Sequence, residues 1–327
     1  MRRGLVLGKF MPIHSGHINL IEFATTKCDE VMVWVCVSNK ETMTADLRFK
    51  WVKEIFKNHP KITPILFEYD EALFPNTSES STSVSEIWSE AIKKHLPKID
   101  IIISSEKYGD YVAEYLEIEH IHYPLPRQIS ATEIRQNPYK NWGFVPEVVK
   151  PYYFRKICIL GTESTGKSTL TKKLAEVFKT EYVSEAGRDI VENSNTCNAH
   201  DLKDIAQTHA NLILQKGKKL DRILFIDTDI NITKSYSKFL FNQELYVEDW
   251  IEEANQCELY IYLDNDAPFI QDGTRLSEPD RNRLDGFHKA QLKRAGVDYH
   301  LIQGDWNERF EKVYQLVLNW FNINEIE

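Results

Sequence analysis

G-T-E-S-T-G-K-S-T, residues 161–169, fits the pattern G-x-x-x-x-G-K-[ST] of loops that bind nucleotide phosphates. The apolar run 157–160 precedes it, and a helix-forming stretch, 170–178, follows it. The motif requires a strand before the loop and a helix after it, and both are in place. A glycine-containing turn before an ordinary helix is the alternative, but it does not account for this context. The sequence therefore predicts a phosphate-binding loop between a buried strand and a helix.

The residue types of this loop suit its chemistry. Gly161 and Gly166 let backbone N–H groups turn towards phosphate oxygens, and the positive end of the following helix adds to the attraction. Lys167 is placed to reach the outer phosphates as a catalytic residue, and the Ser168 hydroxyl is placed to hold Mg²⁺. We expect the ATP phosphates to contact the whole loop, namely Gly161, Thr162, Glu163, Ser164, Thr165, Gly166, Lys167, Ser168 and Thr169.

Length and composition are those of an ordinary soluble protein with two domains. The 327 residues are too many for one domain of common size and suffice for two, each with its own core. Hydrophobic residues make up 42% of the chain and charged residues 27%, which is usual for globular proteins. The net charge of -9 argues against a nonspecific nucleic-acid binder and against a binder of anionic membranes. Anionic substrates must therefore be held by local groups.

The cysteines and the apolar segments bear on the compartment. The five cysteines are scattered, odd in number and without a C-x-x-C pair, so neither a disulfide framework nor a zinc site is indicated. No segment resembles a signal peptide, and no apolar run approaches the length of a membrane span. We therefore expect a cytoplasmic protein with reduced cysteines and no membrane insertion.

A second strand-to-helix turn, G-K-F-M-P-I-H-S-G-H, occupies residues 8–17. A short strand at 4–7 precedes it, and apolar residues at helical spacing follow it. His14 and His17 are three residues apart, which puts both imidazoles on one side of the first helical turn. Either histidine alone is as well explained by a capping or core role. Together the residues resemble the signature of the nucleotidyltransferase superfamily of class I aminoacyl-tRNA synthetase-like folds.

That resemblance implies that the two histidines contact ATP phosphates, with Gly8, Lys9 and Phe10 also at the nucleotide. I-S-A-T-E-I-R, residues 129–135, resembles the second signature of the superfamily, I-S-x-T-x-x-R. In that signature Ser130 and Thr132 cap a helix against phosphate, and Arg135 neutralises phosphate charge. Plain N-capping by Ser130 or Thr132 remains an equal alternative.

Between the two signatures, strands alternate with helices. The expected strands are 30–37, 62–67, 99–104 and 118–123, and the expected helices are 47–56 and 84–95. This alternation predicts a doubly wound parallel sheet with ligands at the carboxyl ends of the strands. Prolines 138, 146 and 151, together with several aromatic residues, indicate a packed joint rather than a floppy linker. The domains are therefore expected at 1–150 and 151–327.

The second domain continues the α/β alternation. The expected strands after the phosphate loop are 181–183, 223–229 and 259–263, then 299–302, and the expected helices are 200–218, 284–295 and 306–321. Asp227 and Asp229 end one strand; one is a candidate metal ligand and the other a candidate proton acceptor, in an order left open. Two surface acids in a turn are the alternative.

A charged loop is expected at 264–283, between the strand 259–263 and the helix 284–295. It contains Arg275, Arg281 and Arg283, which are candidates for a lid that neutralises charge as phosphate transfers. Solvated surface charge explains an isolated arginine just as well. The whole chain is thus expected to be an α/β protein of two doubly wound parallel-sheet domains.

The chain as a whole resembles the bifunctional nicotinamide-nucleotide adenylyltransferases and ribosylnicotinamide kinases of bacterial NAD salvage. The motifs that carry the likeness include the two signatures and the phosphate loop, as well as Ser105-Glu106, V-K-P-Y-Y-F, A-G-R-D, F-I-D-T-D and D-G-T-R. Some members carry an N-terminal helix-turn-helix repressor domain. This chain starts three residues before its first expected strand, so we expect no repressor role and no nucleic-acid partner.

The resemblance implies two reactions. The C-terminal domain would transfer the ATP γ-phosphoryl group to the 5′-hydroxyl of ribosylnicotinamide. The N-terminal domain would then join nicotinamide mononucleotide to the adenylyl group of ATP, giving NAD and pyrophosphate with Mg²⁺ as cofactor. The implied catalytic residues are His14, His17, Arg135, Lys167 and Asp229. The implied substrate-binding residues are Trp88, Arg188, Asp189 and Asp227.

Some features leave room for other interpretations. Ala186 stands where the family commonly has an aromatic residue, and 277–280 is only loosely similar to the family's lid. Trp88 is as well explained by a place in the core. An adenylyltransferase for another phosphorylated acceptor, such as phosphopantetheine or a flavin mononucleotide, is one alternative function. A nucleotide-sensing regulator is another. No stretch specifies an oligomer, although a homo-oligomer is compatible with the sequence.

Overall fold

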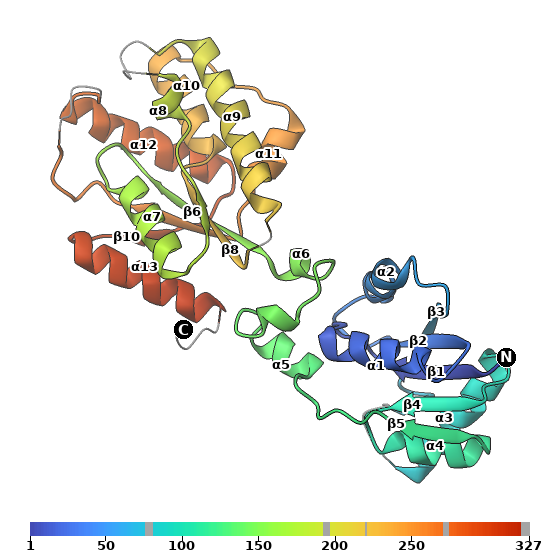
Figure 1. Cartoon of the computed structure of the whole chain (residues 1–327). Coiled ribbons are helices and arrows are strands. Elements are labelled where there is room, and N and C mark those ends of the chain that lie inside the picture. The colour runs from blue at the N-terminus through green and yellow to red at the C-terminus, as the bar shows by residue number, and fades with distance from the viewer. Residues whose placement is uncertain (76–80, 192–196, 220, 271–274, 322–327) are drawn as a thin grey trace. The chain divides into compact units, whose positions relative to one another are not determined.

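The computed structural model describes residues 1–75, 81–191, 197–219, 221–270 and 275–321, without the side chain of Arg188. The chain divides into two compact units, Met1–Tyr152 and Tyr153–Glu327. In the described residues each unit contains one five-stranded sheet, and all recorded strand pairs are parallel (Figure 1). The expected α/β class with two parallel-sheet domains is confirmed.

The first unit has the strand order β3-β2-β1-β4-β5, so its first strand lies in the middle of the sheet. The strands are β1 (Arg3–Gly8), β2 (Glu30–Ser38), β3 (Ile62–Tyr69), β4 (Ile101–Ser104) and β5 (Glu119–His122). The helices are α1 (Ser15–Thr25), α2 (Ala45–Phe56), α3 (Thr82–His95), α4 (Tyr108–Leu116) and α5 (Ala131–Gln136). A 3-10 turn at Trp142–Phe144 and α6 (Lys150–Tyr153) follow them.

Alternation of side chains along the strands makes two cores in this unit. Leu5, Leu7 and Trp34 point to the face that α3 and α4 cover, while Val6 and Val33 point to the other face. Both faces are buried, as expected for a parallel sheet flanked by helices. The near-continuous apolar runs of β1 and β2 follow from this, because neither face meets water.

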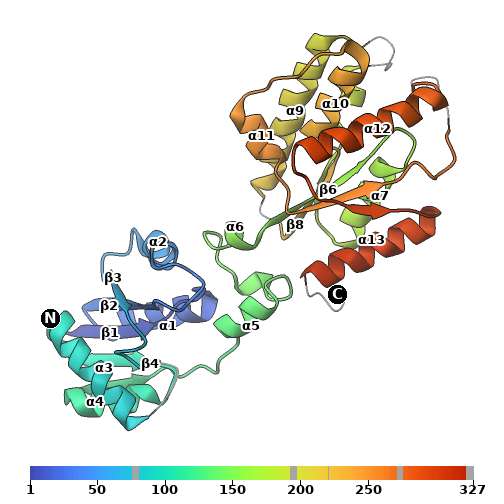
Figure 2. The ribbon, with the colours of Figure 1, turned by 180° about the vertical axis from the view of Figure 1, so that it is seen from behind.

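The second unit has the strand order β10-β9-β6-β8-β7, and again its first strand is the middle one. The strands are β6 (Arg155–Gly161), β7 (Glu181–Val183), β8 (Ile223–Asp227), β9 (Leu259–Leu263) and β10 (His300–Ile302). The helices are α7 (Lys167–Val177), α8 (Gly187–Ile190), α9 (Ala199–Gly217), α10 (Ile230–Phe241), α11 (Asp249–Asn255), α12 (Glu278–Arg294) and α13 (Trp306–Phe321). Helices α7 and α13 pack together on one face, and α9, α10 and α12 cover the other (Figures 1 and 2).

The predicted carboxyl end of the loop 264–283 is wrong, because α12 already begins at Glu278. Ser277 caps it: its hydroxyl accepts a hydrogen bond from the Asp280 backbone N–H at 3.3 Å, and Pro279 occupies the first turn. Helices α10 and α11 were not expected.

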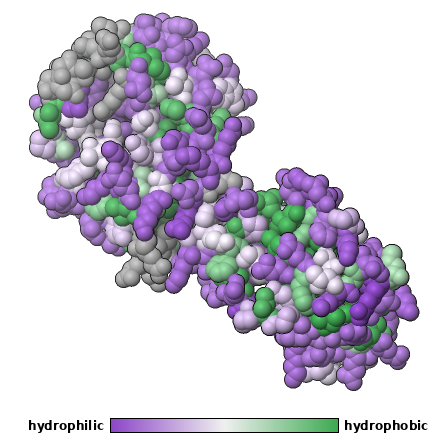
Figure 3. Space-filling model, in the orientation of Figure 1, coloured by the Kyte–Doolittle hydropathy of each residue, from purple (hydrophilic) through white to green (hydrophobic). Residues whose placement is uncertain are grey.

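Among the helices of the described residues, none combines the length and the apolar character of a membrane span. The face in Figure 3 is largely hydrophilic, with scattered hydrophobic patches.

Candidate functional sites

The histidine motif forms the turn from β1 into α1. His14 is the N-cap of α1 and His17 lies in its first turn, so that the two rings stack with centroids 3.7 Å apart. Phe10 is buried and contacts the His17 ring edge-on at 5.0 Å. A Cβ atom on Gly16 would lie 3.1 Å from two atoms of the His14 ring, so a larger residue would push this ring aside. The expected placement of both imidazoles on one side of the turn is what the structure has.

The His14 side chain is buried and His17 is half-buried, and most of their ring nitrogens lack protein partners in the described part of the chain. Among the described residues, no group hydrogen-bonds Nδ1 or Nε2 of His14, or Nδ1 of His17. Burial, with the charge of Arg127 second, lowers the pKa of His14 to about 4 against a smaller effect of Glu133. Burial, His14 and Arg127 lower the pKa of His17 well below its usual value. The rings are therefore neutral at pH 7, and their unpaired nitrogens suit a ligand.

An ion-pair network holds Lys9 at the end of β1. Lys9 Nζ lies 2.8 Å from Glu41 Oε1, and Arg48 Nη2 donates to Glu41 Oε2 at 2.6 Å. Arg48 is fully buried and also donates through Nη1 to the Lys9 backbone carbonyl at 2.9 Å. Burial raises the pKa of Glu41, but the hydrogen bonds from Lys9 and Arg48 outweigh it and lower the pKa overall. Sequence reasoning missed Glu41 and Arg48, because nothing local distinguishes them from surface charges.

The second signature lies beside the first. Arg135, on α5, donates through Nη1 to the backbone carbonyl of Met11 and through Nη2 to Thr132 Oγ1 at 3.1 Å. Ser130 forms a capping box with Glu133: each side chain binds the other residue's backbone N–H, at 3.1 and 2.8 Å. Ser130 is therefore the N-cap of α5, as the capping alternative describes. Arg135 joins the two motifs, which are far apart in the sequence, within one unit.

The phosphate loop in the second unit turns from β6 into α7, as expected. Gly161 has φ +141°, and a Cβ atom there would lie 2.6 Å from the Leu263 carbonyl oxygen of β9. Gly166 is the N-cap of α7. Lys167 Nζ donates to the Thr162 carbonyl at 3.0 Å, and the Thr165 hydroxyl donates to the same oxygen at 2.8 Å. The loop thus closes on itself, and its lysine folds back onto the carbonyl of Thr162.

Three side chains from the rest of the unit brace this loop. Arg281, only 2% exposed, donates through Nε to the Glu163 carbonyl at 2.9 Å. Arg309 donates through Nη1 to the Thr165 carbonyl at 3.0 Å. Tyr236 on α10 donates from its hydroxyl to Glu163 Oε1 at 3.0 Å. The expected swinging lid role of Arg281 is therefore wrong, because burial and these backbone contacts fix it as a support of the loop.

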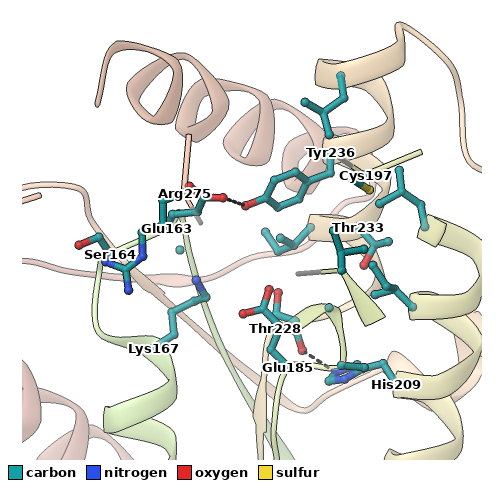
Figure 4. A pocket seen from close by; sticks show the side chains of 18 residues that line it. Glu163, Ser164, Lys167, Glu185, Cys197, His209, Thr228, Thr233, Tyr236 and Arg275 are labelled. Atoms are coloured by element: carbon teal, nitrogen blue, oxygen red, sulfur yellow. Dashed lines mark hydrogen bonds between the residues drawn. The ribbon is translucent and has the colours of Figure 1, made fainter. Parts of the chain in front are cut away.

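Beside the loop lies an open cavity of about 310 Å³, a size that is usual for small-molecule sites (Figure 4). Five of the expected residues line it, namely Gly161, Glu163, Ser164, Lys167 and Arg275. Its other polar lining residues are Glu185, His209, Thr228, Thr233 and Tyr236, and its apolar lining includes Ala186, Leu202 and Ile232. Sequence reasoning did not single out Glu185 or His209 as site residues. Glu185 could have been found from its position just beyond the strand 181–183. His209 could have been found as the polar residue among the buried positions of α9.

Asp227, the last residue of β8, and Asp229, two residues beyond it, do not line this cavity in the described part of the unit. Asp229 is the N-cap of α10: its Oδ1 accepts from the backbone N–H groups of Asn231 and Ile232 at 3.0 and 3.2 Å, and its Oδ2 from the Asn231 amide at 2.8 Å. Burial raises the pKa of Asp229 to about 6 against the lowering effect of these bonds. These contacts show Asp229 as a helix cap, and its role as proton acceptor stays a prediction. Asp227 is buried at the end of β8, next to Ile159 of β6.

The remaining expected site residues lie as follows. Trp88 is 2% exposed, donates from Nε1 to the Pro75 carbonyl at 3.0 Å and packs on Trp34 and Tyr69. The structure therefore places it in the core, with no ring face open to a ligand. Arg283 is exposed on α12 and pairs with Asp280 at 3.0 Å, which makes it a surface residue and not part of a lid.

Four further residues complete the comparison with the expected site. Thr169 and Asp189 are exposed, on α7 and α8 respectively, and neither lines the described cavity. Ser168 is half-buried in the first turn of α7. The side chain of Arg188 lies outside the described part, and so do residues 272–274 of D-G-T-R.

Comparisons with known proteins agree with this two-unit organisation. Residues 5–137 match the family model described as cytidylyltransferase-like, and residues 156–309 match the model described as an AAA domain. A crystal structure of NadR protein in complex with NR is similar in fold, with a TM-score of 0.67 and 18% identity, and the alignment covers 100% of this chain and 98% of that one. A NadR structure in complex with NAD and AMP-PNP has a TM-score of 0.66, at 19% identity.

Two curated relatives extend the likeness to sequence. The trifunctional NAD biosynthesis/regulator protein NadR of Salmonella typhimurium is 31% identical, and the alignment covers 96% of this chain and 82% of the relative. The Escherichia coli protein of the same name is 30% identical with the same coverage. Because this identity covers nearly all of the chain and 82% of each relative, the chain belongs to the NadR family of NAD biosynthesis/regulator proteins.

Proposed function

We propose that this chain synthesises NAD in two steps, one in each unit. The second unit phosphorylates ribosylnicotinamide with ATP, giving nicotinamide mononucleotide and ADP. The first unit transfers the adenylyl group of a second ATP to the mononucleotide, giving NAD and pyrophosphate. The observation that carries the proposal is the presence of two separate strand-to-helix turns, each with the side chains that phosphates need, in a chain of the NadR family.

In the adenylyl transfer the nucleophile is a phosphate of the mononucleotide, which is already an anion. No strong base is needed, so the residues serve to position and neutralise the reacting phosphates. Neutral His14 and His17 offer N–H groups to ATP phosphate oxygens from an already buried position, which spares the cost of reorganisation. Arg135 and Lys9 supply positive charge from either side of the turn. Ser130 and Thr132 present the amino end of α5 to the same phosphates.

In the kinase unit, the loop backbone from Gly161 to Gly166 cradles the ATP phosphates and Lys167 turns from the Thr162 carbonyl to the outer phosphates. Arg275 lines the same cavity and adds positive charge there. Ser168 lies in the first turn of α7, the helix that follows the loop after β6, and Asp227 ends the neighbouring strand β8. Both carry oxygen donors, which suit a hard cation. They would hold Mg²⁺, which neutralises charge on the β- and γ-phosphates when bound.

A coupled assay tests both halves. Wild-type protein with ribosylnicotinamide and Mg-ATP should yield the mononucleotide and then NAD, each detected by chromatography. Lys167→Ala should abolish the first step while sparing adenylylation of supplied mononucleotide, and His17→Ala should have the reverse effect. A wild-type protein that makes neither product would refute the proposal and favour a nucleotide sensor. If the protein adenylylates phosphopantetheine or a flavin mononucleotide instead, the acceptor proposed for the first unit is wrong.

A further inference from the structure

The kinase reaction requires a group that removes the proton of the substrate's 5′-hydroxyl. Asp227, at the end of β8, and Asp229, the N-cap of α10, are not among the described residues that line the cavity. Asp229 is committed to capping α10 through both carboxylate oxygens. Of the acids among the described lining residues of the cavity, Glu163 and Glu185 remain. Glu163 accepts hydrogen bonds on Oε1 from Tyr236 and on Oε2 from the Leu276 backbone at 3.0 Å, so it ties the phosphate loop to its surroundings.

Strand register places Glu185 at the end of the sheet where phosphate transfer occurs. Val183 of β7 pairs with Ile226 of β8, so Glu185 and Thr228 each lie two residues beyond a paired position. The phosphate loop leaves β6 on the other side of β8, at the same carboxyl edge. Figure 4 shows Glu185 and Thr228 between Lys167 and His209 along one wall of the cavity. A carboxylate therefore lies in the same cavity as Lys167, the lysine proposed to contact the transferred phosphoryl group.

We propose that Glu185 is the proton acceptor of the kinase reaction. The inference rests on the proposed phosphorylation of a nucleoside 5′-hydroxyl in this cavity. As the hydroxyl oxygen forms its bond to the γ-phosphorus, its proton passes to a Glu185 carboxylate oxygen. The bond from the γ-phosphorus to the β,γ-bridging oxygen breaks with its electron pair, and ADP leaves. The protonated Glu185 then releases the proton to solvent, so that charge and atoms balance over the cycle.

His209 supports this wall of the cavity. It is buried in α9 and its Nε2 donates to the Thr228 carbonyl at 3.3 Å. Thr228 has φ +72°, an uncommon conformation for a β-branched residue, and it is the residue that separates the two aspartates. The bond therefore holds the backbone of Thr228, which lines the same cavity as Glu185, and the His209 ring also lines this cavity.

The test compares Glu185→Gln with Asp229→Asn in the full chain. Each variant replaces one carboxylate by its amide, but only the first lies in the cavity. For Glu185→Gln we expect kcat for ribosylnicotinamide phosphorylation to fall by about 10²- to 10⁴-fold, with KM for the nucleoside changed by less than about threefold. For Asp229→Asn we expect kcat within about threefold of wild type, because asparagine also caps helices. AMP-PNP binding measured by calorimetry should keep the wild-type stoichiometry in both variants, because unfolding of the second unit would remove one of the two proposed nucleotide sites.

A second variant separates proton transfer from a structural role. In Glu185→Ala, added formate should restore part of the lost kcat in proportion to its concentration, because a free carboxylate can then take the proton. The same formate should leave wild type and Lys167→Ala unchanged. The inference is overturned if Glu185→Gln retains kcat, if only KM rises, if formate fails to rescue, or if Asp229→Asn shows the larger loss. A wild-type protein without kinase activity refutes instead the proposed function.

Discussion

Replacement of Gly161 by alanine should unfold the kinase unit more easily and stop phosphorylation. The new Cβ would lie 2.6 Å from the Leu263 carbonyl oxygen, an atom of β9 that cannot swing away because Gly161 and Leu263 are paired in the sheet. A backbone at φ +141° also costs a residue with a side chain about 1–3 kcal/mol. With the clash added, we expect a loss of at least about 3 kcal/mol, which lowers Tm by roughly 6–12 °C in a unit of this size.

Calorimetry of the full chain, with both activities measured in parallel, gives the readout. Gly161→Ala should lower the transition of the second unit and abolish ribosylnicotinamide phosphorylation, while adenylylation of supplied mononucleotide persists. Gly286→Ala is the matched control: Gly286 is exposed within α12, and a Cβ there meets nothing within 4 Å. This control should raise the stability by up to about 1 kcal/mol, because alanine favours helices. A Gly161→Ala protein whose Tm stays within about 1 °C of wild type would refute the reasoning from backbone strain.

Three further predictions concern buried charge. Glu41→Gln leaves the buried Arg48 without its partner and should cost about 3–5 kcal/mol in urea unfolding, and a loss below about 1 kcal/mol would contradict the network. The Asp229 carboxyl has a pKa raised to about 6, so its ionisation destabilises the fold above that pH and ceases to do so as pH falls towards 4. Asp229→Asn should therefore be more stable than wild type by up to about 3 kcal/mol at pH 8 but not near pH 4, and a pH-independent difference in Tm would count against this. His14 has the opposite sign: because its folded pKa is about 4, the first unit should lose up to about 3 kcal/mol as pH falls from 6.5 to 4, and His14→Asn should lose less.

The two phosphate-binding turns were predictable because their residues are consecutive and each is dictated locally. The glycine, lysine and histidine positions of both motifs lie at strand-to-helix turns, and Arg135 reaches the first motif as its signature implies. The parallel sheets followed from apolar runs that are hydrophobic on both faces. Local signals such as these do not depend on how distant segments pack.

The features that sequence reasoning missed or left open depend on the tertiary structure. Asp229 follows a strand and precedes a helix, and that position suits an N-cap as well as a base. The register of β7, which brings Glu185 to the cavity, is not written in the local sequence. The helical spacing of Trp88 suits a core residue, but only its packing on Trp34 and Tyr69 shows that it lies in the core. The start of α12 at S-E-P-D carried a capping signal that the dense charge of the region obscured.

Each sheet is built outwards from the strand that is synthesised first, since β1 and β6 both end up in the middle. On the ribosome, β1 can pair with β2 early, but its other edge stays open until Ile101–Ser104 emerges. An open, apolar strand edge is a template for association with other nascent chains. If translation stops or slows before β4, the nascent chains should therefore aggregate. If it pauses after α5, all five strands of the first sheet are already present, and both edges of β1 can be paired.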